Sequence, residues 1–124
     1  MVFTLILTSV LCILLASYKN GPASNGSACS GAPFNRGKTC TECHSGGNFG
    51  GQITTQLLDG TTPVTKYTPG KSYIFQIVMT KSTGTPQYGF QTTASTAGDA
   101  NVNTWGTLPF AIHNTLLSGR NYIE

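Results

Sequence analysis

Residues 73–79 read Tyr-Ile-Phe-Gln-Ile-Val-Met, and this stretch decides the fold class of the 124-residue chain. It is rich in β-branched and aromatic residues, and every second side chain from Tyr73 to Met79 falls on one face of a strand. Residues 52–58 alternate in the same way and end at Asp59-Gly60, which is a turn signal. Two alternating segments bounded by turns predict an antiparallel sheet.

Turn residues divide the rest of this half of the chain into further short segments. Pro69 and Gly70 are the residue types that the two central positions of a type II turn require. Weaker strands are predicted at residues 88–94, 104–112 and 120–123, with 114–119 as a connection. Short strands of this kind indicate an all-β protein whose residues 52–124 form an immunoglobulin-like antiparallel β-sandwich. Such a sandwich has about seven strands and fewer are predicted here, so we expect either a C-terminally incomplete sandwich or an edge completed by another chain.

The charge content of the chain excludes several function classes. Seven Lys and Arg residues face four Asp and Glu residues, giving a net charge of +3, and the cations are scattered singly. Nucleic-acid binding needs a concentrated basic face, so we expect no nucleic-acid partner. The sequence has only four carboxylates and shows no Ser/His/Asp set and no phosphate-binding loop, which also argues against an enzyme.

Residues 2–16 form an uncharged and mostly apolar run at the beginning of the sequence. As a helix with a rise of about 1.5 Å per residue, the run spans about 22 Å, which is short of the ~30 Å hydrocarbon core of a bilayer. We therefore expect residues 1–17 to be a signal peptide or N-terminal apolar leader, and no stable membrane span. The predicted location is extracytoplasmic: the periplasm, the cell surface or the medium.

Residues 18–51 are rich in Gly, Ser and Asn without a periodic apolar pattern, which predicts an irregular arm. Within this arm, residues 40–44 read Cys-Thr-Glu-Cys-His. Cys-x-x-Cys-His is the attachment signature of c-type haem, in which both thiols form thioethers and the histidine binds the iron from the proximal side. We therefore expect one covalent haem c per chain, held by Cys40 and Cys43, with His44 as the proximal ligand.

The remaining haem contacts have few candidates. His113 is the only other histidine and the preferred distal ligand, although a backbone carbonyl or solvent is an equally ordinary partner for its imidazole. Met79 is a second candidate for the distal position, but it lies in phase with the apolar positions of its predicted strand. Phe34 and Phe49 bracket the motif in a region with little other apolar material, so we expect them to cover the porphyrin.

Cys29 leaves two alternatives open for the cysteines. With Cys40, Cys43 and His44 it could supply the Cys₃His set of a structural zinc site. It could instead form a disulfide with Cys40 or Cys43, since exported proteins usually carry oxidised thiols.

Several short stretches also carry a resemblance to a known family: Asn20-Gly21-Pro22, Gly31-Ala32-Pro33, residues 39–51, Tyr67-Thr68-Pro69-Gly70 and Tyr88-Gly89-Phe90-Gln91. In this order they resemble the reeler-like bacterial surface proteins of the choice-of-anchor V type, over roughly residues 18–124. The resemblance implies an exported immunoglobulin-like sandwich, usually followed by further strands and a C-terminal anchoring segment that this sequence lacks. Cys29 departs from the pattern of the family.

The motif, the leader and the resemblance together predict an exported monohaem c-type, cytochrome-like electron-transfer protein. Its expected partners are a redox protein and further copies of itself, joined through open sheet edges as a homo-oligomer or filament. The alternative is a non-enzymatic surface adhesion or interaction β-sandwich, in which the Cys pair is a structural disulfide or a metal site.

Overall fold

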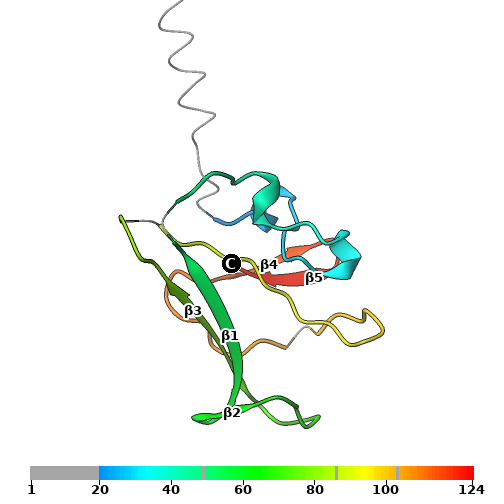
Figure 1. The fold of residues 1–124 in the computed structure, drawn as a ribbon. Coiled ribbons are helices and arrows are strands. Elements are labelled where there is room, and N and C mark those ends of the chain that lie inside the picture. Colours follow the sequence, from blue (N-terminus) through cyan, green and yellow to red (C-terminus); the bar gives the residue numbers. More distant parts are fainter. Residues whose placement is uncertain (1–19, 49, 86, 103) are drawn as a thin grey trace, which may run out of the picture. The chain divides into compact units, whose positions relative to one another are not determined.

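The chain is all-β in the computed structural model, which describes residues 20–48, 50–85, 87–102 and 104–124. The described part contains five strands in two small antiparallel sheets and three single 3₁₀ turns (Figure 1). None of its helices is long and apolar enough to cross a membrane. The predicted leader, residues 1–17, and Phe49 lie outside the described residues. The chain divides into two compact units, one formed by Gly46–Tyr88 and the other by the residues before and after it.

The unit Gly46–Tyr88 is built on a three-stranded antiparallel sheet of order β2-β1-β3 (Figure 1). The alternating segments predicted from the sequence are β1 (Gln52–Asp59) and β3 (Ile74–Thr80), which pair along their length. The third strand, β2 (Thr62–Val64), was not predicted, because it has only three residues and includes Pro63. It returns alongside β1 through the tight loop at Gly60, whose φ is 62°.

The predicted type II turn between β2 and β3 is confirmed. The Lys71 N–H donates to the Thr68 carbonyl at 3.2 Å, and Gly70 has a φ of 82° at the second central position. A positive φ at this position is the reason that the turn requires glycine.

The second sheet is a hairpin of β4 (Asn114–Leu117) and β5 (Arg120–Ile123). Its two-residue loop, Ser118-Gly119, has φ values of 52° and 76°, as a type I′ turn requires. The prediction of β5 is confirmed, whereas the prediction of residues 114–119 as a connection is wrong. The polar-apolar alternation of β4 covers only four residues and is followed at once by the turn residues Ser118-Gly119, so the whole segment was predicted as a connection.

The predicted strands at residues 88–94 and 104–112 are also wrong. In the first segment the backbone makes a single bridge, between Thr92 and Ile123, while the neighbouring side chains of Gln91 and Thr93 bond to other segments. In the second segment the chain turns at Pro109, whose carbonyl accepts a hydrogen bond from the Ile112 N–H at 3.1 Å.

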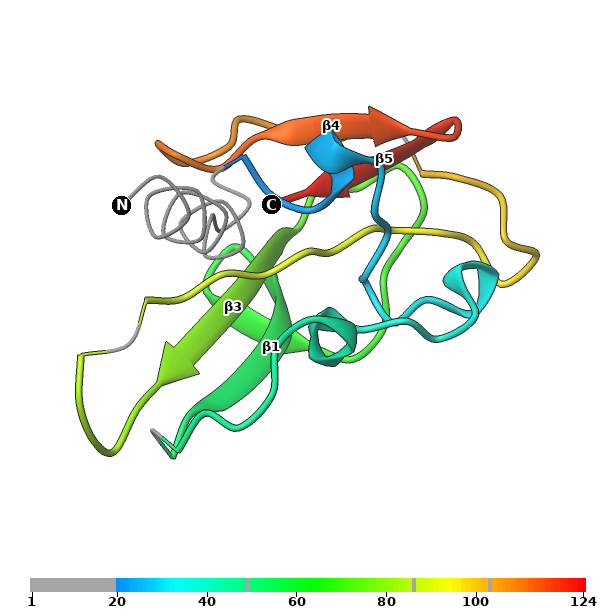
Figure 2. The same ribbon diagram turned by 90° about the horizontal axis from the view of Figure 1, so that it is seen from above.

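The most buried residues lie at the end of β5 and on the arm that precedes the first sheet. Tyr122, Ile123 and Glu124 are 2%, 4% and 7% exposed, and Ala23 of the 3₁₀ turn η1 (Ala23–Asn25) is 4% exposed. Figure 2 shows η1 against β4. The core of this unit therefore joins the N-terminal arm to the C-terminal hairpin.

Candidate functional site

The Cys-x-x-Cys-His motif forms one helical turn. Its first three residues are η3 (Cys40–Glu42), and the Cys40 carbonyl accepts hydrogen bonds from the Cys43 N–H at 3.2 Å and the His44 N–H at 3.0 Å. In a helical turn, residues three and four positions apart lie on the same face. Cys40, Cys43 and His44 therefore share one face of the turn, and all three are exposed. Two free thiols and an imidazole on one accessible face match the donor set that c-type haem attachment requires.

A cavity of about 360 Å³ opens beside this turn. This volume lies within the range of about 300–1,000 Å³ that is usual for ligand pockets. Its lining includes two thiols, of which Cys43 belongs to the motif, one aromatic ring and three charged side chains: Cys29, Cys43, Phe34, Arg36, Lys38 and Glu42. The structure thus brings Phe34, predicted from the sequence to contact the porphyrin, into the same cavity as Cys43.

The base of the arm is held by the side chain of Gln91, which is 8% exposed. Its Nε2 donates to the Ser27 carbonyl at 3.3 Å and to Glu124 Oε2 at 2.9 Å. Its Oε1 accepts a hydrogen bond from the Cys29 N–H. A single glutamine therefore holds the backbone at Ser27 and Cys29, which both line the cavity.

The Glu124 carboxylate holds the start of the arm. Its Oε2 accepts a hydrogen bond from the Ala23 N–H at 2.9 Å, and its Oε1 accepts one from the Ser24 N–H at 3.3 Å. The carboxylate lies against Gly21, which has a φ of 81°, and a Cβ at this glycine would come within 2.2 Å of Glu124 Cδ. Glycine is needed at this position for both reasons.

Strand β5 holds the middle of the arm through two further contacts. The Tyr122 hydroxyl donates to Asn35 Oδ1 at 3.0 Å, and the Arg120 guanidinium lies 3.6 Å from the centroid of the Phe34 ring. Both partners belong to the 3₁₀ turn η2 (Pro33–Asn35). These contacts hold the segment before the Cys-x-x-Cys-His turn in place.

Cys29 lies in the cavity as a half-buried thiol. Burial raises the pKa of the Cys29 thiol, and the nearby Cys40 and Cys43 raise it further. Cys29, Cys40 and Cys43 are all free thiols, and among the described residues no three His, Cys, Asp or Glu side chains are arranged to hold a metal ion. The disulfide and the Cys₃His site therefore stay predictions, as does the haem.

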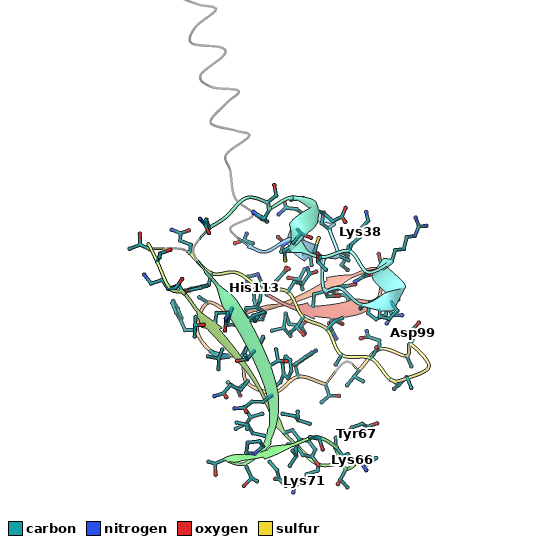
Figure 3. The ribbon with its side chains drawn as sticks, viewed as in Figure 1. Lys38, Lys66, Tyr67, Lys71, Asp99 and His113 are labelled. Carbon is teal, nitrogen blue, oxygen red and sulfur yellow. The ribbon has the colours of Figure 1, made fainter. Side chains whose placement is uncertain are left out.

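The two candidates for the distal ligand lie in different surroundings. His113 directly precedes β4 (Figure 3), and its Nε2 is 2.7 Å from the Asn20 carbonyl. Because a carbonyl only accepts, Nε2 carries the proton, and iron binding by this nitrogen would require the loss of the bond. Met79 lies in β3, opposite Ile53 and half-buried, in the other compact unit.

Sequence reasoning missed two residues of this site, Gln91 and Glu124. Gln91 ends one of the stretches that carry the family resemblance, Tyr88-Gly89-Phe90-Gln91, which was a usable signal. Glu124 has no local signal, because its partners are about 100 positions away in the sequence.

Comparison with known proteins identifies no family: the chain matches no protein-family model, and no curated protein or solved structure is significantly similar to it. The resemblance to reeler-like proteins of the choice-of-anchor V type therefore stays a prediction based on the stretches quoted above.

Proposed function

We propose that this protein is an exported monohaem c-type, cytochrome-like electron carrier. The observation that supports the proposal most directly is the helical turn at residues 40–44, in which the Cys40 carbonyl accepts from both the Cys43 and the His44 N–H groups. This turn gives the two thiols and the imidazole a common, exposed face. A haem bound there would supply a one-electron couple at its iron.

The side chains of the motif have separate roles in this proposal. The Cys40 and Cys43 thiols would hold the haem, each adding its S–H across one vinyl group, with sulfur bonding to one carbon and hydrogen to the other, so that attachment would consume no oxidant. The His44 imidazole would be a ligand to the iron. Phe34 offers an aromatic surface beside Cys43, in a part of the chain with few other apolar side chains.

The anchoring of the arm supports electron transfer rather than a transient binding role. Gln91, Glu124 and Tyr122 hold the arm at Cys29, Ala23 and Asn35 by buried or partly buried hydrogen bonds. Contacts that hold the segment before the motif suit an electron carrier, whose cofactor site should change little in geometry between its two oxidation states. His113 stays the candidate distal ligand of the proposal, through Nδ1, because the Asn20 carbonyl engages Nε2.

We propose further that the two sheets belong to an immunoglobulin-like sandwich of the reeler-like, choice-of-anchor V type, located outside the cytoplasm. The sheet order leaves an edge for a partner: β2 pairs only with Leu57, Leu58 and Asp59 of β1, and β3 is the outer strand on the opposite side. Unpaired strand edges in the described sheet favour association with a further copy of the chain or with the redox partner.

The test is covalent haem attachment, measured on the chain and two variants produced with c-type maturation enzymes. The wild type should show the pyridine haemochrome bands of haem c and an intact mass increased by one haem. Replacing both Cys40 and Cys43 with serine should abolish the bands and the mass increase. The matched control is Cys29→Ser, which removes a thiol of the same arm and should leave both signals unchanged.

A colourless wild-type protein with three thiols open to alkylation would overturn the proposal. A colourless protein in which Cys40 and Cys43 are joined in a disulfide or hold a metal ion would overturn it as well, and would favour the adhesion or interaction module instead. A wild type that attaches haem equally well after the loss of Cys40 and Cys43 would contradict the assigned role of these residues.

A further inference from the structure

Strand β3 is an outer strand of the three-stranded sheet and has a free edge. Its inner edge pairs with β1 along all seven of its residues, from Ile74 to Thr80. Among the described residues, no other strand and no isolated bridge pairs with its outer edge (Figure 1). An outer strand of this kind presents a row of backbone N–H and C=O groups that can pair with another chain.

The sequence of β3 lacks the features by which edge strands usually resist pairing. It contains no proline and no charged residue. The opposite edge of the sheet differs, because β2 has only three residues and one of them is Pro63. Of the two edges, β3 is therefore the one suited to pairing with a further strand.

Apolar side chains are exposed on both faces of β3. Phe75 is 42% exposed on one face, and Ile74 and Val78 are 56% and 40% exposed on the other. A partner stacked on one face would leave the apolar side chains of the other face in water. A strand added at the edge would contact side chains on both faces, because cross-strand neighbours interact on each face of a sheet. The exposure of these three side chains therefore favours a partner at the edge.

A second copy of β3 fits this edge in an antiparallel arrangement. A two-fold axis at Ile77, the middle residue of the strand, pairs all seven residues of one copy with those of the other. Phe75 then lies opposite Met79 of the second copy, which places an aromatic ring beside a thioether. Gln76 lies opposite Val78, so every pair keeps to one face of the sheet, as an antiparallel ladder requires.

The charges near the ends of the strand also favour this arrangement. Lys81 directly follows β3, and the register places it opposite Tyr73 of the second copy rather than opposite another lysine. An ammonium group beside an aromatic ring is attractive, whereas like charges directly opposite each other are destabilising. Lys71, the other nearby cation, pairs with Asp59 of its own chain. A second copy therefore brings no like charges together at this edge.

We propose that this protein forms a dimer in which the β3 strands of two copies pair antiparallel about Ile77 and join two three-stranded sheets into one of six strands. The inference rests on the association through sheet edges proposed above, and it does not depend on haem attachment. Both copies use the same surface in such a two-fold interface. Because each copy has one β3 edge, the assembly closes at two chains.

The experiment measures the mass of the full chain by sedimentation at several protein concentrations. Two double variants change the exposed residues Gln76 and Val78, which face each other across the proposed axis: Gln76→Glu/Val78→Glu and Gln76→Lys/Val78→Lys. In a dimer of identical chains each variant places like charges directly opposite each other, so the association constant should fall by about 100-fold or more. An equimolar mixture of the two variants should form a dimer again, since opposite charges then face each other.

The matched control is Thr54→Glu/Gln56→Glu on the central strand. Thr54 and Gln56 are exposed and are the partners of Val78 and Gln76 in the β1–β3 ladder. The new charges therefore lie on the same face but two strand spacings, about 10 Å, from the second copy, where salt screens them. The control should dimerise as the wild type does. Recovery of the dimer in the mixture shows that each charged variant of β3 is folded.

Three results would overturn the inference. The first is a wild type that stays monomeric at every concentration or grows into open-ended assemblies. The second is a pair of β3 variants that each sediment as the wild type does. The third is a mixture of these variants that stays monomeric, or a control that loses the dimer as they do. The colour of the same samples reports haem separately, so a colourless dimer would refute the haem function alone and a haem-loaded monomer the dimer alone.

Discussion

Replacing Glu124 with alanine tests whether the end of β5 holds the arm in place. The substitution removes three hydrogen bonds, from the Ala23 N–H at 2.9 Å, the Gln91 Nε2 at 2.9 Å and the Ser24 N–H at 3.3 Å. Gln91 keeps its bond to the Ser27 carbonyl at 3.3 Å, whereas the Ala23 N–H is left buried and without its side-chain acceptor.

The magnitude follows from the two shorter bonds. A hydrogen bond to a charged group contributes roughly 1.5–3 kcal/mol, and its loss from a buried donor also leaves that donor unsatisfied. Because the bonds share one carboxylate and are not additive, we take the lower value for each and expect a loss of about 3 kcal/mol. This is a large part of the stability of a small domain, which is roughly 5–15 kcal/mol.

The assay is equilibrium unfolding in urea, followed by the fluorescence of Trp105, with wild type and variant in the same haem state. With a slope of about 1.5 kcal/mol per molar urea, the midpoint should fall by about 2 M. Glu42→Ala removes an exposed carboxylate from the same arm and should change the free energy of unfolding by less than about 0.5 kcal/mol. A Glu124→Ala midpoint that coincides with that of Glu42→Ala would refute the anchoring role.

Two further predictions concern the arm. Tyr122→Phe keeps the buried ring but removes the hydrogen bond to Asn35 Oδ1, so the free energy of unfolding in urea should fall by about 1 kcal/mol; an unchanged midpoint would show that this bond contributes nothing. The second prediction concerns the Cys29 thiol in the chain without haem, whose pKa is raised above 9.0, the ordinary value for cysteine. Alkylation of Cys29 by iodoacetamide should therefore reach half its maximal rate above pH 9.0. A pH profile equal to that of the urea-unfolded chain would contradict this prediction. Above pH 9.0 the unfolded thiol loses its proton while the native thiol retains it, so stability should decrease as pH rises there, and Cys29→Ser should remove that decrease.

The strands with a long alternating pattern could be predicted from the sequence. Alternation over seven or more residues is sufficient for β1 and β3, and Pro69-Gly70 determines the turn before β3. The strand β2 has only three residues and includes Pro63, and the four residues of β4 run directly into the turn signal at Ser118-Gly119, whereas the equally short β5 was predicted. The failure at residues 88–94 has a different cause: the bonds of Gln91 go from its side chain to the arm and to Glu124, and no local rule anticipates them.

The candidate site shows the same division. The spacing of Cys40, Cys43 and His44 predicted a haem attachment site, and Phe34 was predicted to contribute beside them; the helical turn at residues 40–44 is seen only in the structure. The place of Arg36 and Lys38 in the cavity lining was not predicted, because Arg36 has a φ of 56°, in a left-handed region where asparagine or glycine is usual. The anchors on β5 act across separations of about 90 to 100 residues, and only the folded chain reveals them.

The attachment of the arm to the last strand sets an order of events during biogenesis. Ala23 and Glu124 are 101 positions apart, and contacts between such distant residues form slowly because a long loop must close first. Until that closure, the arm that carries Cys40 and Cys43 lacks its bonds to Glu124. Because both thiols are also exposed in the folded chain, we expect them to stay open to chemical modification before and after the hairpin docks.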